Sequence, residues 1–255
     1  MLTIRDLEVA FGPRVVARVP ELEIGRGEIV GLAGESGSGK SMTALAILGL
    51  ARFAGATVHG SIALDGRELV GLRDRELREV RGRRIAMIMQ SPRAALNPTL
   101  RLGELFERTL RLHDVPRGDL RARTVDGMQS VRLDPDLLER YPHQVSGGQA
   151  QRFAIALALA LHADVLLADE PTSALDVTVQ AEVINLLRRV RDERGTAMLF
   201  ISHDLAVIGE LADRIMVMRR GDVVEVGETR RVLQAPAAEY TRDLIAAVPR
   251  IGARA

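Results

Sequence analysis

Residues 34–41, Gly-Glu-Ser-Gly-Ser-Gly-Lys-Ser, match the phosphate-binding loop pattern G-x-x-x-x-G-K-[ST]. An apolar run at residues 29–33 precedes them, and a helical pattern at 42–48 follows. The motif needs this order of strand, loop and helix, because its backbone N–H groups form an anion cradle at the N-terminus of the helix. We therefore predict an α/β phosphate-loop fold, in which Lys40 reaches the β- and γ-phosphates of a nucleotide and Ser41 ligates Mg²⁺.

The basic residues of the chain give this loop independent support. Lysine and arginine together number 35, and Lys40 is the single lysine among them. A planar guanidinium cannot replace a compact ammonium beneath a chain of phosphates. A glycine-rich turn without a ligand has no such preference, so the composition favours a nucleotide site over an accidental match.

Composition restricts the remaining functions. With 255 residues, of which 47% are apolar, the chain can bury a sizeable core. A net charge of +1 argues against binding nucleic acid or anionic lipid through overall charge. The absence of cysteine excludes disulfides, thiol catalysis and cysteine-ligated metals. Neither a signal peptide nor an apolar run of about 20 residues is visible, so we expect a soluble protein whose membrane role would come through a partner.

Apolar runs alternate with helical patterns along most of the chain, which predicts a mostly parallel sheet with crossover helices and an antiparallel β part near the N-terminus. Between residues 91 and 140, prolines separate short, arginine-rich helical patterns, and no long β run occurs. We read an inserted α-helical subdomain here. Within a single domain of residues 1–255, we expect a catalytic core with its β part at 1–90 and 163–227, the helical subdomain at 91–162, and a C-terminal extension at 228–255.

Two carboxylates, Asp169 and Glu170, end an apolar strand downstream of the loop. In nucleotide hydrolases an aspartate so placed holds Mg²⁺ through water, and the adjacent glutamate is the natural candidate to activate the attacking water. The alternative is a surface acidic pair, which the preceding buried strand disfavours. His203 also ends an apolar strand, where a γ-phosphate sensor would sit. We interpret the remaining histidines as structural; they are His59, His113, His143 and His162.

A second anion site is predicted at residues 146–149, Ser-Gly-Gly-Gln, which begin a helix. Ser146 can cap this helix, with Gln149 completing a capping box. Such a helix start has no lysine and is able to bind a γ-phosphate presented by another subunit. Phe11 is open to two interpretations, stacking on an adenine ring or ordinary core packing.

Taken together, these motifs strongly resemble the ATP-binding-cassette (ABC) ATPases over essentially the whole chain. The resemblance makes residues 34–41 the Walker A motif, Gln90 the Q-loop, 146–149 the signature, 166–170 the Walker B motif, 173–176 the D-loop and His203 the switch histidine. Val145 precedes the signature where leucine is common, which is a conservative departure.

The family implies a head-to-tail dimer in which each ATP lies between the Walker A motif of one subunit and the signature of the other. Glu170 would be the general base, His203 would hold the γ-phosphate, and Gln90 would link the site to the membrane partner. By this resemblance, the catalytic residues are Glu170, His203 and Gln90, and the Mg²⁺ ligands are Ser41, Gln90 and Asp169. The resemblance assigns ATP binding to Phe11, Gly34, Glu35, Ser36, Gly37, Ser38, Gly39, Lys40, Ser41, Met42, Ser146, Gly147, Gly148, Gln149 and Asp176.

Within the family, residues 90–98 and 239–249 resemble the extended Q-loop and the Tyr-Thr-Arg-x-Leu-x-x-Ala-x-Pro tail of the peptide and nickel importers. Those systems combine two different ATPase subunits with two permease subunits and an extracytoplasmic solute-binding protein. The resemblance implies ATP-driven import at the cytoplasmic face of the cell membrane, without nucleic acid. The solute, peptide or nickel chelate, stays open, although residues 89–93 resemble the nickel type. The alternatives are an exporter ATPase and a non-transport ABC ATPase acting on DNA or ribosomes.

Overall fold

The computed structural model describes residues 1–247 and divides the chain into two compact units. The first comprises Met1–Leu77 and Ala197–Ala255, and the second comprises Arg78–Thr196. The candidate motifs are distributed over both units.

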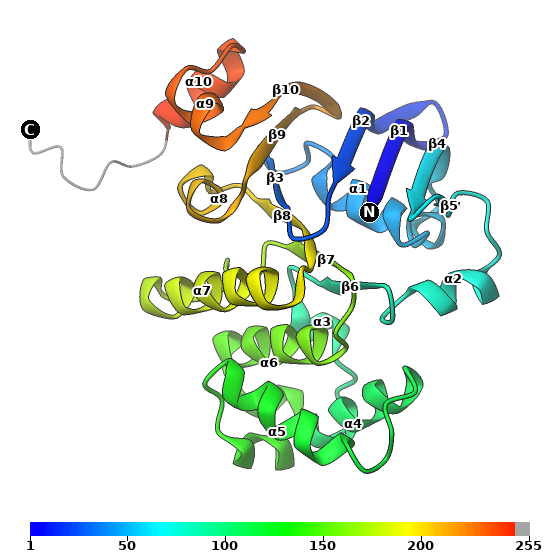
Figure 1. Cartoon of the computed structure of the whole chain (residues 1–255), viewed down its shortest axis with the longest axis vertical. Helices are drawn as coiled ribbons and strands as arrows, with labels where there is room; N and C mark the ends of the chain where they lie inside the picture. Colours follow the sequence, from blue (N-terminus) through cyan, green and yellow to red (C-terminus); the bar gives the residue numbers. More distant parts are fainter. Residues whose placement is uncertain (248–255) are drawn as a thin grey trace, which may run out of the picture. The chain divides into compact units, whose positions relative to one another are not determined.

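The first unit is built on a mixed sheet with the strand order β5-β4-β1-β2-β10-β9-β3-β8. Strand β3 pairs in parallel with β8 and β9, whereas β1, β2, β4 and β5 form antiparallel pairs, with β1 between β2 and β4 (Figure 1). The parallel strands and the N-terminal antiparallel part are both as predicted. The bounds are β1 (Leu2–Phe11), β2 (Arg14–Ile24), β3 (Ile29–Ala33), β4 (Thr57–Leu64), β5 (Arg67–Glu68), β8 (Ala197–Ser202), β9 (Arg214–Arg219) and β10 (Asp222–Glu228).

Helices and turns connect these strands. Helix α1 follows the phosphate loop, and α10 is the last helix of the described chain. The helices are α1 (Lys40–Ile47), a 3-10 turn (Ala51–Ala54), α2 (Asp74–Val80, which contains the boundary between the units), α8 (Leu205–Leu211), α9 (Thr229–Gln234) and α10 (Glu239–Ala246).

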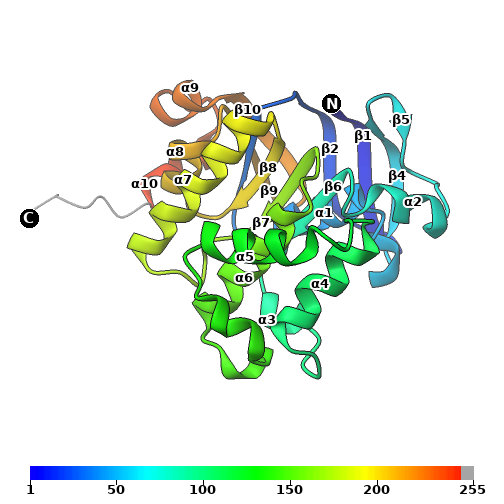
Figure 2. The same ribbon diagram turned by 60° about the horizontal axis from the view of Figure 1, so that its bottom comes forward.

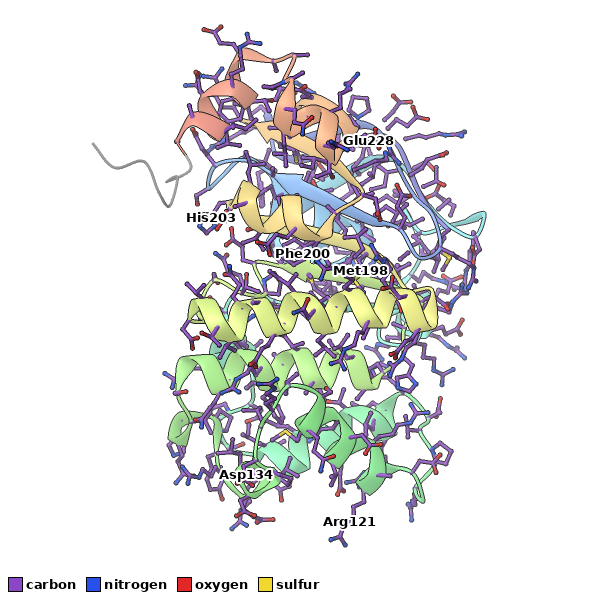
Figure 3. The ribbon with its side chains drawn as sticks, turned by 60° about the vertical axis from the view of Figure 1, so that its left-hand side comes forward. Arg121, Asp134, Met198, Phe200, His203 and Glu228 are labelled. Carbon is purple, nitrogen blue, oxygen red and sulfur yellow. The ribbon has the colours of Figure 1, made fainter. Side chains whose placement is uncertain are left out.

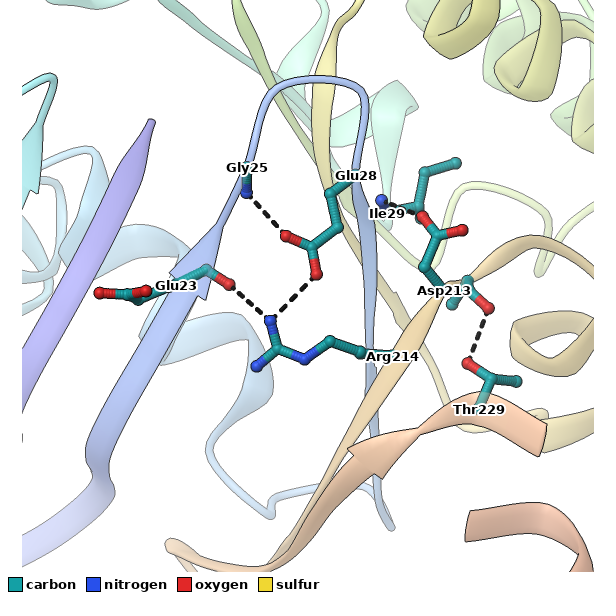
Figure 4. A network of polar contacts seen from close by, with 8 residues as sticks. Glu23, Gly25, Glu28, Ile29, Asp213, Arg214 and Thr229 are labelled. Atoms are coloured by element: carbon teal, nitrogen blue, oxygen red, sulfur yellow. Dashed lines mark hydrogen bonds and ion pairs between the residues drawn. The ribbon is translucent and has the colours of Figure 1, made fainter. Parts of the chain in front are cut away.

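A polar network fixes the start of β3, the strand that leads into the phosphate loop (Figure 4). The Ile29 N–H donates to Asp213 Oδ2 over 2.8 Å. Glu28 is held at both carboxylate oxygens, by the Gly25 N–H at 2.7 Å and by the Arg214 guanidinium at 3.0 Å. Every residue of β3 is buried, and this network joins the start of the strand to residues about 185 positions away in the chain.

The second unit contains one parallel pair of strands, β6 (Ile85–Ile88) and β7 (Val165–Asp169), and a group of helices (Figure 2). Phe106 on α4 and Phe153 on α6 are fully buried and meet edge to face, with ring centroids 5.7 Å apart. The helices are α3 (Pro92–Ala95), α4 (Leu102–Leu112), α5 (Leu120–Ser130), α6 (Gly147–Ala160) and α7 (Val177–Arg194), with 3-10 turns at Pro135–Glu139 and Pro142–Gln144.

Two local predictions can be compared with these elements. The region from 91 to 140 contains helices and no strand among its described residues, as expected. The amphipathic pattern of residues 181–194 predicts a helix from residue 181, but the helix begins at Val177, because the Asp176 carboxylate caps it by accepting from the Val179 N–H at 3.0 Å. The predicted boundaries at residues 90, 163 and 228 differ from those of the two compact units, and this subdivision stays a prediction. Residues 248–255 of the predicted C-terminal extension lie outside the described chain.

Candidate functional site

Lys40 lies beneath the phosphate loop and is almost fully buried, with 6% of its surface exposed. Its ammonium donates to the carbonyl oxygens of Gly34 at 2.7 Å and Glu35 at 2.8 Å. An ammonium carries three hydrogen-bond donors on a compact head group. It can therefore bond to the carbonyl oxygens of the loop and also face an anion that the loop holds. The geometry supports the predicted role of Lys40.

Two glycines of the loop are required by its shape. Gly34 has φ 147° and Gly39 has φ 104°, in the region that side chains rarely adopt. A Cβ on Gly34 would also collide with the carbonyl oxygen of Met218, and one on Gly39 would lie 2.5 Å from that of Val16. The loop is therefore packed against backbone on one side, while Glu35, Ser36 and Gly37 are exposed on the other.

The remaining candidates of the first unit lie at strand ends. Phe11 is the last residue of β1 and is 36% exposed, so its ring is available to a ligand and is not a core side chain. His203 is exposed directly after β8, whose Met198 and Phe200 are fully buried (Figure 3). Ser41 and Met42, in the first turn of α1, are partly exposed. Adenine stacking and γ-phosphate sensing stay predictions for Phe11 and His203.

In the second unit, the predicted carboxylates end a completely buried strand. Asp169 is 4% exposed and Glu170 is 8% exposed. Glu170 has φ 49°, which is unusual for a residue with a side chain, and its carbonyl oxygen accepts from both the backbone N–H and the hydroxyl of Ser173. Such a conformation costs free energy and persists only where the surrounding structure holds it. Residues in such conformations cluster at functional sites.

The signature residues begin α6 with the predicted capping box. The Gln149 N–H donates to the Ser146 hydroxyl at 3.2 Å, and the Ser146 N–H donates to Gln149 Oε1 at 2.9 Å. Ser146 and Gly147 are exposed, and a Cβ added to Gly148 would lie 3.5 Å from the carbonyl oxygen of Ala174 in the D-loop. The observed contact of Asp176 is the α7 cap, and its role toward ATP stays a prediction.

The Q-loop candidate Gln90 is exposed, two residues beyond the end of β6. Arg93 in the following helix α3 donates to the carbonyl oxygen of Val145, the residue before the signature. Within the second unit, the Arg93 side chain thus joins the Q-loop segment to the residue before α6.

The oxygen donors predicted for Mg²⁺ are of the hard type that this ion prefers: a hydroxyl (Ser41), a carboxylate (Asp169) and an amide (Gln90). Among residues 1–247, no group of three or more His, Asp or Glu side chains forms a metal site of its own. In the same part of the chain, no helix combines the length and apolarity required to cross a bilayer.

Comparison with known proteins decides the family. Residues 18–173, which contain the loop, the signature and the Asp169–Glu170 pair, match the family model described as ABC transporter. The chain belongs to the ABC transporter family. Solved cassettes share the fold: a dimeric, post-hydrolysis ATP-binding cassette bound to ADP and Pi is 28% identical, with a TM-score of 0.80 over 90% of this chain and 99% of that one.

Curated relatives cover almost the whole chain. The probable D,D-dipeptide transport ATP-binding protein DdpD of Escherichia coli is 46% identical over 91% of this chain and 72% of its own length. The glutathione import ATP-binding protein GsiA of Pectobacterium atrosepticum is 42% identical over 99% of this chain, which spans 42% of that relative. The peptidoglycan transport ATP-binding protein YejF of Agrobacterium fabrum is 43% identical, and the chain spans 47% of it.

The sequence motifs did not identify Tyr240 as a residue that contacts the loop. The Tyr240 hydroxyl on α10 accepts a hydrogen bond from the Glu35 N–H at 3.2 Å. Tyr240 stands in the tail that resembles the importer C-terminal segment, and this resemblance was the available signal. Val248 and Pro249, which complete that segment, lie outside the described residues.

Proposed function

We propose that this chain is the ATP-hydrolysing subunit of an importer that takes up peptides across the cytoplasmic membrane. The relative DdpD carries the proposal, because it is 46% identical over most of both proteins and its name describes D,D-dipeptide transport. The buried Lys40, placed under a loop that can hold phosphates, supports the ATPase part.

The proposed chemistry assigns one task to each motif. The loop N–H groups and Lys40 bind the β- and γ-phosphates of ATP, and Phe11 stacks on the adenine. Glu170 accepts the proton of the attacking water, and His203 holds the γ-phosphate. Mg²⁺, when bound by Ser41, Gln90 and Asp169, neutralises charge on the phosphates.

The proposed partners follow from the family. A second ABC ATPase subunit, a different chain, would pair head to tail so that each signature completes the other subunit's nucleotide site. Two permease subunits would hold the pair at the cytoplasmic face of the membrane, and an extracytoplasmic solute-binding protein would deliver the solute. The names of the relatives favour peptides or glutathione as the solute over nickel. An exporter ATPase and a DNA- or ribosome-associated ATPase are the competing functions.

The experiment that tests this proposal is affinity purification of the Glu170→Gln variant from native membranes with ATP, followed by mass spectrometry. Two permeases and a second ATPase chain are expected, and a co-purified solute-binding protein would identify the solute class by its own ligand. Recovery with DNA or ribosomes, or without any permease, would overturn the importer assignment.

Substitution of the signature serine should separate nucleotide binding from pairing. In a Glu170→Gln background, Ser146→Arg should leave ATP binding by the single chain intact and prevent ATP-driven association, because a long cation at an exposed helix start obstructs the facing site. Light scattering with and without ATP measures the association. Loss of the Ser146 cap should cost about 1 kcal/mol of stability, which a thermal unfolding curve checks.

The matched control for this test is Ser130→Arg, which changes another exposed serine, at the end of α5. It should pair normally with ATP. ATP-driven association that persists in the Ser146→Arg variant would refute the prediction that the signature lies in the dimer interface.

A further inference from the structure

Tyr240 joins the last described helix to the phosphate loop. Tyr240 is 6% exposed, and its hydroxyl accepts from the Glu35 N–H at 3.2 Å across 205 positions of sequence. The Arg219 guanidinium lies over the Tyr240 ring, 4.7 Å from its centroid. A buried tyrosine usually places its hydroxyl against a partner, and here that partner is the backbone of the loop.

The backbone of Glu35 links Tyr240 to Lys40. The N–H of Glu35 donates to Tyr240, and the carbonyl oxygen of the same residue accepts from the Lys40 ammonium at 2.8 Å. The Glu35 side chain is exposed, so its backbone is the part held on both sides. Tyr240 therefore restrains the residue whose carbonyl positions the phosphate-binding ammonium.

Glu225 on β10 fixes the start of α10, the helix that carries Tyr240. Its carboxylate accepts from the Ala237 N–H at 2.7 Å and from the Ala238 N–H at 3.1 Å, directly before the helix. Burial would raise the pKa of Glu225, but hydrogen bonds to the carboxylate, including those from Ala237 and Ala238, outweigh burial and lower the pKa. The carboxylate is therefore ionised at neutral pH and attracts the N–H groups at the helix start.

The burial pattern of β10 is the reverse of the usual one. Glu225 is its buried residue at 7% exposure, whereas its neighbours Val224 and Val226 are 36% and 37% exposed. An irregularity of register between Val223 and Glu225 accompanies this arrangement. A strand that buries a carboxylate and exposes valines loses the stabilisation of apolar burial. The buried carboxylate instead makes the two hydrogen bonds that hold the start of α10.

We propose that Tyr240 is a positioning residue of the nucleotide site, and that α10, held by Glu225, sets the affinity of the phosphate loop for ATP. This inference rests on the proposed ATPase function. Without the Tyr240 hydroxyl, the loop samples more conformations, and nucleotide binding must select the competent one. Affinity then falls, while the chemical step in the loaded site is unchanged.

The test compares Tyr240→Phe with the wild type and with Tyr141→Phe, which changes the other tyrosine of the chain, in the second unit. Phenylalanine keeps the ring under Arg219 and removes only the hydroxyl. The dissociation constant and the KM for ATP should rise about 3- to 10-fold, the size of one hydrogen bond, with kcat unchanged. Amide exchange at Glu35, measured without nucleotide, should speed up by a similar factor. Tyr141→Phe should change none of these quantities.

Glu225→Gln provides a second variant that keeps the side-chain shape. It should weaken ATP binding in the same direction, and the double variant should lose less than the product of the two single effects, because both act through α10. Wild-type KM and Glu35 exchange in a folded Tyr240→Phe protein would overturn the inference alone. A wild type that binds no ATP would overturn the proposed function as well.

Discussion

Lys40→Ala should abolish ATP binding at concentrations that saturate the wild type. The ammonium is buried and already aligned by Gly34 and Glu35, so its loss removes the cationic hydrogen-bond donor of the loop and leaves only the backbone N–H groups to bind the phosphates. Such bonds contribute about 1.5–3 kcal/mol each, so the affinity should fall about 100-fold or more. Isothermal titration with ATP and Mg²⁺ measures the change directly.

Two further variants separate charge from shape. Lys40→Arg retains the positive charge and should still lose most of the affinity, because a planar guanidinium does not fit the compact site beneath the loop. Arg26→Ala removes an exposed cation from the turn before β3 and should bind ATP as the wild type does. Unchanged nucleotide affinity in a folded Lys40→Ala protein would refute the phosphate-loop assignment.

Glu170→Gln should retain ATP binding and lose about 10²- to 10⁴-fold in turnover, the usual contribution of a general base. Glutamine has nearly the same shape as glutamate, so the left-handed backbone conformation and the hydrogen bonds from Ser173 should persist. Phosphate release under saturating ATP measures turnover, and the binding titration confirms that the site still fills.

The control for this prediction is Glu193→Gln, an exposed glutamate near the end of α7 whose change should leave turnover within about twofold. Near-normal hydrolysis by Glu170→Gln would assign the base to another residue.

Features that depend on neighbouring residues could be predicted from the sequence. The loop at 34–41 is preceded by β3 and followed by α1, as its pattern requires. The capping box of Ser146 and Gln149 was also predicted. In both cases the residues involved lie a few positions apart, so composition and spacing specify these features without knowledge of the fold.

Other features depended on contacts between distant residues. Residue patterns do not state the order of the strands, because many pairings satisfy the same alternation of apolar residues. The left-handed conformation of Glu170 has no signature of its own, since residue type alone favours φ below zero there. The start of α7 differed from its prediction because the Asp176 cap lies before the apolar pattern begins.

The contact between Tyr240 and Glu35 shows the distinction most clearly. The identity of the phosphate loop, its lysine and its family resemblance are local properties of residues 34–41 and of short motifs downstream. That a helix 205 positions later holds this loop follows only once β9, β10 and α10 have packed beside it, with Glu225 buried and Arg219 over the tyrosine ring. Short-range hydrogen bonds join residues that are close in the sequence, so residue type and spacing predict them. A long-range hydrogen bond forms only after folding has brought its donor and acceptor together.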